Sequence, residues 1–356
     1  MSAPAVDRPS AEVGPRTELG SARSGRDLAE RALGGERRAL ARLLTEIEER
    51  SAAGEAGLRS LYPMAGAAHL VGVTGAPGSG KSTLVAALVG EARRGGRAVA
   101  VVAIDPSSPI TGGAILGDRV RMQAYAGDRD VFIRSMASRG HAGGLAPATV
   151  AAVAVLDAVG FPLVFVETVG TGQSEVEIAA IADTTVVVQA PEMGDEVQAI
   201  KAGLLEVADL VVVNKGDRPG AHRAASQLRA MLTVGAVHDR AANASGRPRP
   251  KRPEVLLATA LDGSGVAELL AALDRRHAAR AEDGGQQAAR LARARAELDG
   301  ILAERLQARL HTPAMAALTS AAVAAIAAHE MDPYAAADRL LDELSRPGGG
   351  PGRGWP

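Results

Sequence analysis

Short apolar runs rich in valine alternate with amphipathic segments through the middle of the chain. Six of these runs predict strands, at residues 70–74, 98–105, 161–168, 184–190, 210–215 and 254–260. Continuous apolar runs are typical of strands buried on both faces, as in parallel sheets covered by helices on each side. We therefore expect an α/β fold with a doubly wound, mostly parallel sheet, whose ligands collect at the carboxyl ends of the strands.

Amphipathic helical patterns occupy the two ends of the chain. Near the start, apolar residues follow the i, i+3, i+4, i+7 spacing of a buried helical face, at Leu40, Leu43, Leu44 and Ile47. Near the end, leucines recur at four-residue steps before Pro313, at Leu298, Leu302, Leu306 and Leu310. These patterns predict helical N- and C-terminal extensions around the central sheet.

The same patterns divide the chain into five parts. Residues 1–24 mix Pro, Ser, Gly and charges and predict a disordered leader; residues 25–66 form a helical lead-in, and 67–280 the central domain. Residues 281–345 predict a helical region whose apolar stripe packs either on the chain's own domain or on a second copy of the chain, and 346–356 predict a flexible tail. Because no run reaches the roughly 18 apolar residues of a membrane helix and no signal peptide is evident, we expect a cytoplasmic protein without a membrane partner.

A phosphate-binding pattern follows the first predicted strand. The residues GAPGSGKS, from Gly75 to Ser82, match G-x-x-x-x-G-K-[ST], and a helical pattern begins directly after them. Glycines let backbone N–H groups surround an anion at a helix N-terminus, Lys81 adds a mobile charge, and Ser82 offers a hydroxyl to Mg²⁺. The motif predicts a P-loop NTPase that binds its nucleotide through Gly75, Pro77, Gly78, Ser79, Gly80, Lys81, Ser82 and Thr83.

A second motif indicates which base is bound. Asn214, Lys215 and Asp217 form N-K-x-D after a buried strand. The Asp217 carboxylate can accept two hydrogen bonds, from the ring N–H and the exocyclic amine of guanine, which adenine does not offer. Thr259 and Ala260 end another strand, where a backbone amide is expected to meet the guanine oxygen. Together they favour guanine over adenine.

Acids near strand ends are candidates for holding Mg²⁺. Asp105 and Glu167 each close a predicted strand, and Asp118 is a third candidate. Glu167 begins E-x-x-G, which places the Gly170 amide where it can approach a γ-phosphate. For each acid, a helix cap or a loop salt bridge is the alternative interpretation.

Composition excludes several classes of site and partner. Lys plus Arg number 40 against 41 Asp plus Glu, and a net charge of −1 gives no electrostatic reason to expect nucleic acid or an anionic membrane as partner. The absence of cysteine excludes disulfides, thiolate metal sites and cysteine nucleophiles, which fits a reducing compartment.

Seven motifs, taken in order, resemble the MeaB/ArgK-type GTPases, the methylmalonyl-CoA mutase-associated chaperones. They are GAPGSGKS, DPSSP, GGAILGDRVRM, SRGHAGG, ETVGTGQSE, GDEVQAIKAG and NKGD, and the likeness covers residues 35–273 closely. The resemblance implies that residues 67–280 form a G domain for GTP and GDP, with Mg²⁺ held through Ser82 and with Asp105, Asp118 and Glu167 around it. It also implies a homodimer formed by residues 281–345 and a cobalamin-dependent acyl-CoA mutase as partner.

By the same likeness, Asp195 and Lys201 belong to a mobile loop that couples partner binding to the nucleotide, and Lys201 joins Lys81 and Glu167 as a catalytic candidate. The chain departs from the family at Thr171, where we expect valine. Ras-like enzymes place a water-orienting glutamine there, so its absence predicts slow intrinsic hydrolysis that a partner accelerates. Gln173 is either a water-positioning residue or a loop hydrogen-bonding residue.

The motifs leave three other functions to be distinguished. A metal-delivery GTPase would need cysteine or clustered histidine to carry nickel, which this chain lacks. A P-loop kinase would need a pocket for a phosphoryl acceptor, and a nucleotide-regulated scaffold would bind GTP without partner-stimulated turnover.

Overall fold

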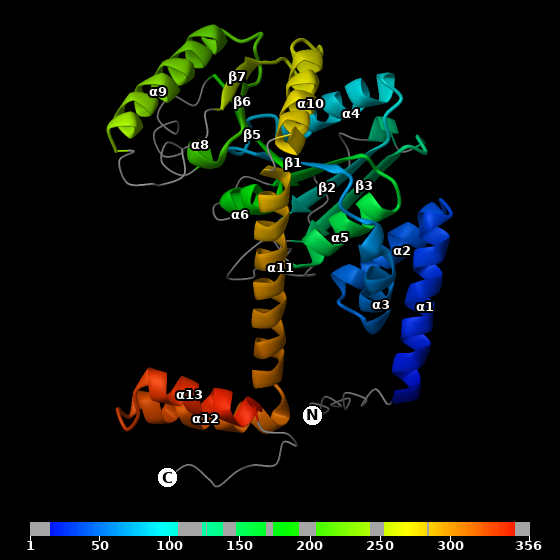
Figure 1. The fold of residues 1–356 in the computed structure, drawn as a ribbon, viewed down its shortest axis with the longest axis vertical. Coiled ribbons are helices and arrows are strands. Elements are labelled where there is room, and N and C mark those ends of the chain that lie inside the picture. The colour runs from blue at the N-terminus through cyan, green and yellow to red at the C-terminus, as the bar shows by residue number, and fades with distance from the viewer. Residues whose placement is uncertain are drawn as a thin grey trace, which may run out of the picture. The chain divides into compact units, whose positions relative to one another are not determined.

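The structure of the chain is a computed structural model (Figure 1). It describes residues 15–105, 123–125, 127–137, 147–168, 174–191, 204–242, 253–282 and 285–345. The chain divides into two compact units, Met1–Arg293 and Ala294–Pro356. Each unit is described by itself.

A seven-stranded parallel sheet forms the centre of the first unit. The strands are β1 (His69–Thr74), β2 (Val99–Asp105), β3 (Val131–Ala137), β4 (Leu163–Thr168), β5 (Thr184–Gln189), β6 (Leu210–Val213) and β7 (Glu254–Leu257). Their order across the sheet is β3-β2-β4-β1-β5-β6-β7, and neighbours pair in parallel. The predicted α/β fold class is confirmed, with β3 as an additional edge strand that the apolar pattern did not predict.

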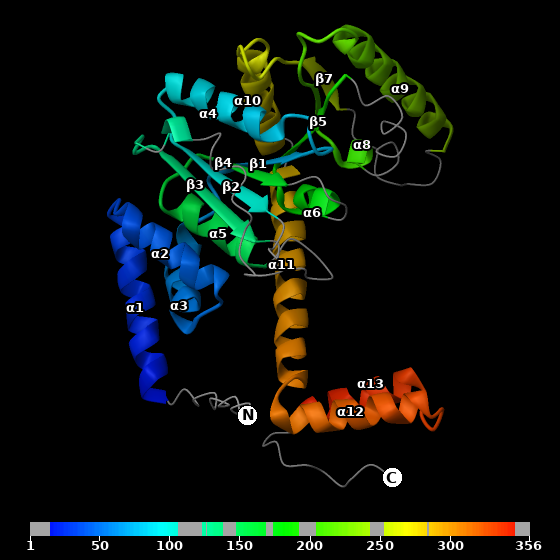
Figure 2. The same cartoon turned by 180° about the vertical axis from the view of Figure 1, so that it is seen from behind.

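Helices cover both faces of the sheet (Figures 1 and 2). One face packs against α4 (Lys81–Arg94) and α10 (Val266–Glu282) through side chains such as Val71, Val101 and Phe165. The other face packs against α5 (Pro147–Ala158), α6 (Ser174–Ile181), α8 (Leu204–Val207) and α9 (Ala221–Ala242). Because strand side chains alternate between faces, the valine-rich strands fill both cores.

Three helices form the lead-in: α1 (Pro15–Leu33), α2 (Arg37–Glu48) and α3 (Ala52–Leu61). The predicted apolar face of α2 is buried, with Leu43 and Leu44 fully inaccessible. Residues 15–24, expected to belong to a disordered leader, are helical instead. This helix packs closely on α3, since a Cβ at Gly25 would lie 2.0 Å from the Ala53 carbonyl oxygen. Local composition does not reveal such a tertiary contact.

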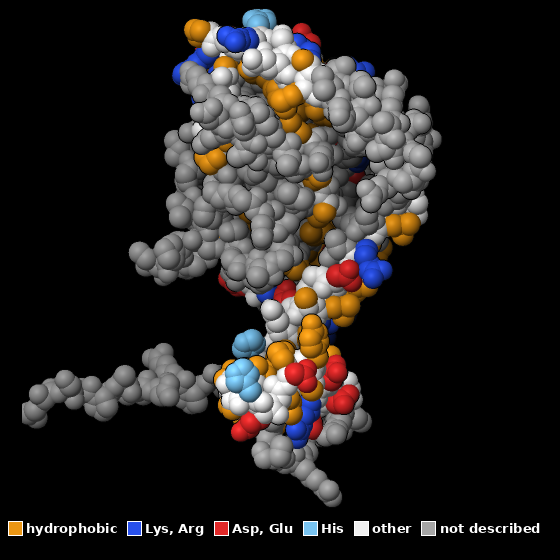
Figure 3. Space-filling view, turned by 90° about the vertical axis from the view of Figure 1, so that its left-hand side faces the viewer, with side chains coloured by type: hydrophobic (Ala, Val, Ile, Leu, Met, Phe, Trp, Pro, Cys, Tyr) orange, Lys and Arg blue, Asp and Glu red, His pale blue; other side chains and the backbone are white. Residues whose placement is uncertain are grey.

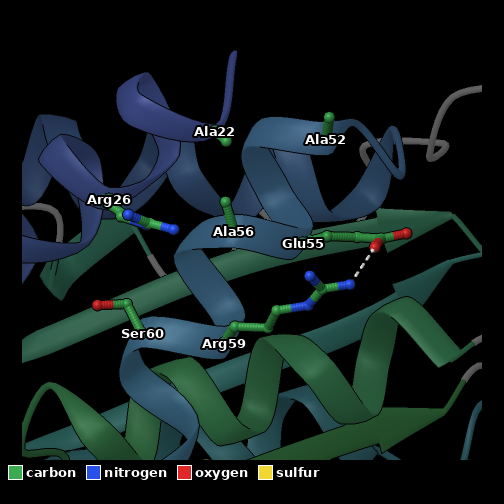
Figure 4. A pocket seen from close by; sticks show the side chains of 7 residues that line it. All are labelled: Ala22, Arg26, Ala52, Glu55, Ala56, Arg59 and Ser60. Atoms are coloured by element: carbon green, nitrogen blue, oxygen red, sulfur yellow. Dashed lines mark hydrogen bonds and ion pairs between the residues drawn. The ribbon is translucent and has the colours of Figure 1, made fainter. Parts of the chain in front are cut away.

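A hollow of about 390 Å³ opens between α1 and α3 (Figure 4). Alanine side chains line it together with two arginines, one of which, Arg59, forms an ion pair with Glu55. The lining residues are Ala22, Arg26, Ala52, Glu55, Ala56, Arg59 and Ser60. None of these residues was predicted to bind nucleotide, so this hollow is separate from the predicted site.

The second unit is helical. The helix α11 (Gly285–Leu310) runs into it and is followed by α12 (Pro313–Ala327) and α13 (Pro333–Ser345). Leu298, Leu302 and Leu306 are 53%, 56% and 38% exposed, and apolar side chains lie at the surface among charged ones (Figure 3). The predicted leucine stripe is therefore an uncovered apolar surface of this unit.

Among the helices that the structure describes, no single one is both long and apolar enough to cross a bilayer. Glu297–Leu310 and Pro313–Ala327 pass that test only as a pair, and they are bent by 88° at the break between them.

Candidate nucleotide-binding site

The phosphate loop leaves the carboxyl end of β1 with a backbone that requires glycine. Gly75, Gly78 and Gly80 have φ angles of +135°, +76° and +90°. A Cβ on Gly75 would lie 2.1 Å from the Val188 carbonyl oxygen, and one on Gly80 would lie 2.4 Å from Asn214 Nδ2. The loop therefore packs directly against the ends of β5 and β6, which sets its position over the sheet.

Lys81 is the first residue of α4 and is only 6% exposed. Its Nζ donates hydrogen bonds to the carbonyl oxygens of Gly75 at 2.7 Å and Ala76 at 3.0 Å. A helix N-terminus carries a partial positive charge and unsatisfied N–H groups. The ammonium is thus held over the loop at the place where an anion is bound best.

Ser82 and Glu167 meet beside the loop. The Ser82 hydroxyl donates a hydrogen bond of 2.6 Å to Glu167 Oε1, and both side chains are buried. Glu167 reaches this place because β4 neighbours β1, with Val73 and Glu167 in register. A hydroxyl and a carboxylate are the oxygen ligands that Mg²⁺ takes together with phosphates and water, so the pair fits that ion. Among the described residues, no group of three or more His, Asp or Glu forms a metal site made of protein ligands alone.

Asn214 joins the phosphate loop to the NKxD turn. Its side-chain Nδ2 donates to the carbonyl oxygens of Ser79 at 3.0 Å and Gly80 at 3.3 Å. Its Oδ1 accepts from the Ala260 N–H at 3.1 Å. The Ala260 amide, expected to meet the guanine oxygen, therefore donates to Asn214 in this structure.

The turn that presents Asp217 is held by backbone hydrogen bonds. Lys215 has a φ of +57°, and the Gly216 N–H donates to the Ala258 carbonyl at 3.0 Å. Asp217 itself is exposed. The Asp217 carboxylate thus lies on an exposed turn next to the loop, where the sequence predicts that it selects the base.

A second turn lies next to it, after β7. Thr259 N–H donates to the Ser264 carbonyl at 2.8 Å, and Ser264 N–H donates to Asp262 Oδ1 at 2.8 Å. The latter hydrogen bond lowers the pKa of Asp262. The two turns are thereby fixed relative to each other through Gly216 and Asn214.

The predicted site residues divide into three groups. The structure brings together the loop, the NKxD turn, Glu167 and the 259–260 turn. Asp105 ends β2, and its Cα is in register with Ala137. Asp118, Gly170 and Lys201 lie outside the described residues, as do Thr171, Gln173 and Asp195.

Two buried threonines were not predicted to belong to the site. Thr168 Oγ1 donates to Thr74 Oγ1 at 3.1 Å, which ties the ends of β4 and β1 together directly beneath Glu167 and the loop. Thr74 immediately precedes the phosphate-loop motif, and this position in the sequence was the available signal.

Three features meet at the carboxyl ends of the parallel strands: a phosphate loop with its lysine, a serine–glutamate pair and an NKxD turn. Together they define a P-loop GTPase. The model of the family described as methylmalonyl Co-A mutase-associated GTPase MeaB matches residues 40–315. The chain belongs to this family, which confirms the predicted resemblance and the assignment as a GTPase.

Individual relatives agree with the family. A protein of Pyrococcus horikoshii named as a GTPase is 42% identical over 324 residues, covering 89% of this chain and 98% of its own length. The GTPase ArgK of Escherichia coli is 45% identical over 187 residues, 51% of this chain and 56% of its own. The crystal structure of a LAO/AO transport system kinase matches with a TM-score of 0.64 at 26% identity, covering 94% of this chain and 100% of that one.

Proposed function

We propose that this GTPase is a Mg²⁺-dependent chaperone that assembles, protects and reactivates a cobalamin-dependent acyl-CoA mutase of the methylmalonyl-CoA mutase type. The observation that carries the proposal is the connection of the phosphate loop to the NKxD turn through Asn214, in a chain whose family is described by its association with that mutase. We also place the protein in the cytoplasm, as the sequence predicts.

The ion belongs to this proposal. Ser82 and Glu167 would hold Mg²⁺, with Asp105 and Asp118 as further candidates. When bound, the ion would supply positive charge that stabilises the phosphate oxygens as the bond between the γ-phosphorus and the leaving oxygen breaks. The hydrogen bond between Ser82 and Glu167 supports this proposal, because it brings the two side chains to the same point.

The remaining residues bind and orient the nucleotide. Lys81 exchanges its bonds to the Gly75 and Ala76 carbonyls for bonds to phosphate, without leaving the helix N-terminus. Asp217 selects guanine, and the loop amides surround the phosphates. Gly170 and Lys201 complete the proposed site by sensing the γ-phosphate and coupling it to the client.

A homodimer formed by residues 281–345 is part of the same proposal. Three residues of the leucine stripe, Leu298, Leu302 and Leu306, are exposed in the single chain. Burial of such a surface stabilises association by about 25 cal/mol per Å², before the costs of association are subtracted. Light scattering after size exclusion is expected to give twice the chain mass. The variant Leu302→Glu is expected to give one chain mass, with Ala303→Glu as a control for added charge; a monomeric wild type contradicts the dimer.

The chaperone function is tested with purified components. The protein, loaded with GTP, a non-hydrolysable GTP analogue or GDP, is mixed with the apo-mutase, and association is measured by light scattering. We expect different affinities in the three states, and Lys81→Ala is expected to abolish the difference. Equal association in all states would contradict the proposal.

The kinase alternative is tested in the same reactions with GTP labelled at the γ-phosphate. A GTPase releases the label as inorganic phosphate, whereas a kinase moves it to another molecule. Label on the mutase, or on a small molecule from the mixture, would favour the kinase. GTP binding without any mutase-stimulated release would favour the scaffold.

A further inference from the structure

The helix α2 of the lead-in lies along β3, the edge strand of the sheet (Figure 2). At the first residue of α2, the Arg37 guanidinium donates to the carbonyl oxygens of Asp128, Arg129 and Val131 at 3.0, 2.9 and 2.7 Å. It also lies 5.5 Å from the ring centroid of Phe132. Arg37 thus fixes the start of β3 with contacts that a neighbouring strand would otherwise supply.

Glu48, the last residue of α2, fixes the other end of β3. Its Oε2 accepts a hydrogen bond of 2.6 Å from Arg134, and its Oε1 accepts one of 3.2 Å from the Ala137 N–H. The two side chains are only 15% and 19% exposed. A charge-assisted pair with this little solvent contact is stronger and more rigid than a surface ion pair.

The end of β3 lies beside the strand that carries a predicted metal ligand. Ala137 is in register with Asp105, the last residue of β2. On the other side of β2, Ala103 is in register with Glu167 of β4. Asp105 therefore lies at the end of β2, between β3 on one side and β4, which carries Glu167, on the other. Glu48 fixes the end of β3.

We propose that Glu48 is a positioning residue for the magnesium end of the nucleotide site, through which the helical lead-in fixes the end of β2, where Asp105 lies. Its carboxylate fixes Arg134 and the Ala137 amide, these fix the end of β3, and β3 fixes the end of β2 by parallel pairing. The helical lead-in then contributes to Mg²⁺ binding as well as to stability. This inference rests on the proposed Mg²⁺-dependent function.

The mode of action predicts a graded series of variants. Glu48→Gln keeps an oxygen for the Ala137 N–H and loses the charge, whereas Glu48→Ala loses both interactions. We expect Glu48→Ala to raise the Mg²⁺ concentration for half-maximal GTP hydrolysis, by less than the roughly tenfold that marks the loss of a group hydrogen-bonded directly to a metal ligand. Glu48→Gln is expected to give a smaller increase, and the rate at saturating Mg²⁺ is expected to stay close to that of the wild type in both.

Two further variants separate positioning from loss of stability. Glu48→Ala/Arg134→Ala leaves no unpaired guanidinium, and the shift in Mg²⁺ dependence is expected to persist in it. Glu55→Gln removes the exposed Glu55–Arg59 pair of the same lead-in and is the matched control, with an unchanged Mg²⁺ dependence. All variants are measured in the full-length chain, alongside their thermal unfolding.

The outcomes are distinct. Lower thermal stability with a Mg²⁺ dependence within twofold of the wild type in both alanine variants would overturn the inference and leave the GTPase intact. A wild-type chain whose GTP hydrolysis does not depend on Mg²⁺ would overturn the proposed function, and the inference with it.

Discussion

Ser82 and Glu167 are 85 positions apart in sequence, yet the hydroxyl of one donates a hydrogen bond of 2.6 Å to the carboxylate of the other. Both side chains are buried, at 8% and 3% exposure. The bond exists because α4 begins directly after the phosphate loop that leaves β1, and β4 pairs directly with β1. Two of the four side chains that the sequence predicts around the ion are therefore brought to one point by the topology of the sheet.

The first prediction concerns this pair. Ser82→Ala removes the hydroxyl, so the Mg²⁺ concentration for half-maximal GTP hydrolysis is expected to rise and the rate at low Mg²⁺ to fall by about 10- to 100-fold. Phosphate release measured across a Mg²⁺ titration checks this. Ser60→Ala, at an exposed serine of α3, is the control, and an unaltered titration for Ser82→Ala would count against the assignment.

The second prediction separates the glycines of the phosphate loop. Gly75→Ala is expected to destabilise the chain more than Gly78→Ala, because its Cβ would meet the Val188 carbonyl oxygen whereas the space around Gly78 is open. Both have positive φ, so Gly78→Ala is expected to cost about 1–2 kcal/mol from backbone strain alone. Urea unfolding gives both values. An equal decrease in the free energy of unfolding for both variants would show that β5 shifts to accommodate the new methyl group.

The third prediction concerns the base. Asp217→Asn replaces one of two acceptor oxygens with an N–H₂ donor, so the affinity for GTP and GDP is expected to fall by about 100-fold or more. Affinity for xanthosine triphosphate, which carries a carbonyl in place of the guanine amine, is expected to rise. Calorimetry with GTP, ATP and xanthosine triphosphate measures the three affinities. The affinity for ATP is expected to stay unchanged in Asp217→Asn. Tight ATP binding by the wild type would refute guanine selection.

The fourth prediction concerns the pH dependence of stability and a histidine at the amino end of β1. His69 starts β1, stacks on His277 of α10 with ring centroids 4.2 Å apart, and pairs with the Thr184 hydroxyl at 2.9 Å. Burial, reinforced by the charge of His277 and slightly by Arg97, lowers the pKa of His69 to about 4, against the opposing influence of Asp183 and Asp274.

A histidine with a lowered pKa is protonated more readily in the unfolded chain, so its contribution to stability is complete above pH 6.5 and is lost as the pH falls from 6.5 to about 4. The loss totals about 3 kcal/mol, since one unit of pKa is worth about 1.4 kcal/mol. His69→Phe keeps an aromatic stack and is expected to unfold with a shallower pH dependence in this range. Denaturant unfolding from pH 4 to 7 measures it, with exposed His222→Gln as control; parallel curves for His69→Phe and wild type would contradict the assignment.

The apolar pattern predicted six of the seven strands but not β3. Its sequence, VFIRSMA, places Arg134 and Ser135 in the middle of the run, and residues 133–135 are half-buried. An edge strand has a neighbour on one side only, so its apolar requirement is weaker. What makes this segment a strand is pairing with β2 and cover from Arg37 and Glu48, which are distant in sequence.

The site shows the same division. The motif around Lys81 and Ser82 predicted the phosphate loop from eight consecutive residues, because glycine turn, lysine and helix start are local features. The role of Asn214 in holding the loop was not predicted. Its amide reaches Ser79 and Gly80, 135 and 134 positions away, and only the strand order places β6 close enough.

The sequence by itself determined the α/β class, the strand and helix segments with strong apolar periodicity, and the residues predicted to bind phosphate and base. These properties depend on neighbours along the chain. The tertiary structure alone decided that α1 is helical from Pro15, that Arg37 and Glu48 complete the edge of the sheet, and that Ser82, Glu167 and Asn214 converge. Those contacts join residues far apart in the chain, and they form only when burial of both faces of the sheet fixes the order of its strands.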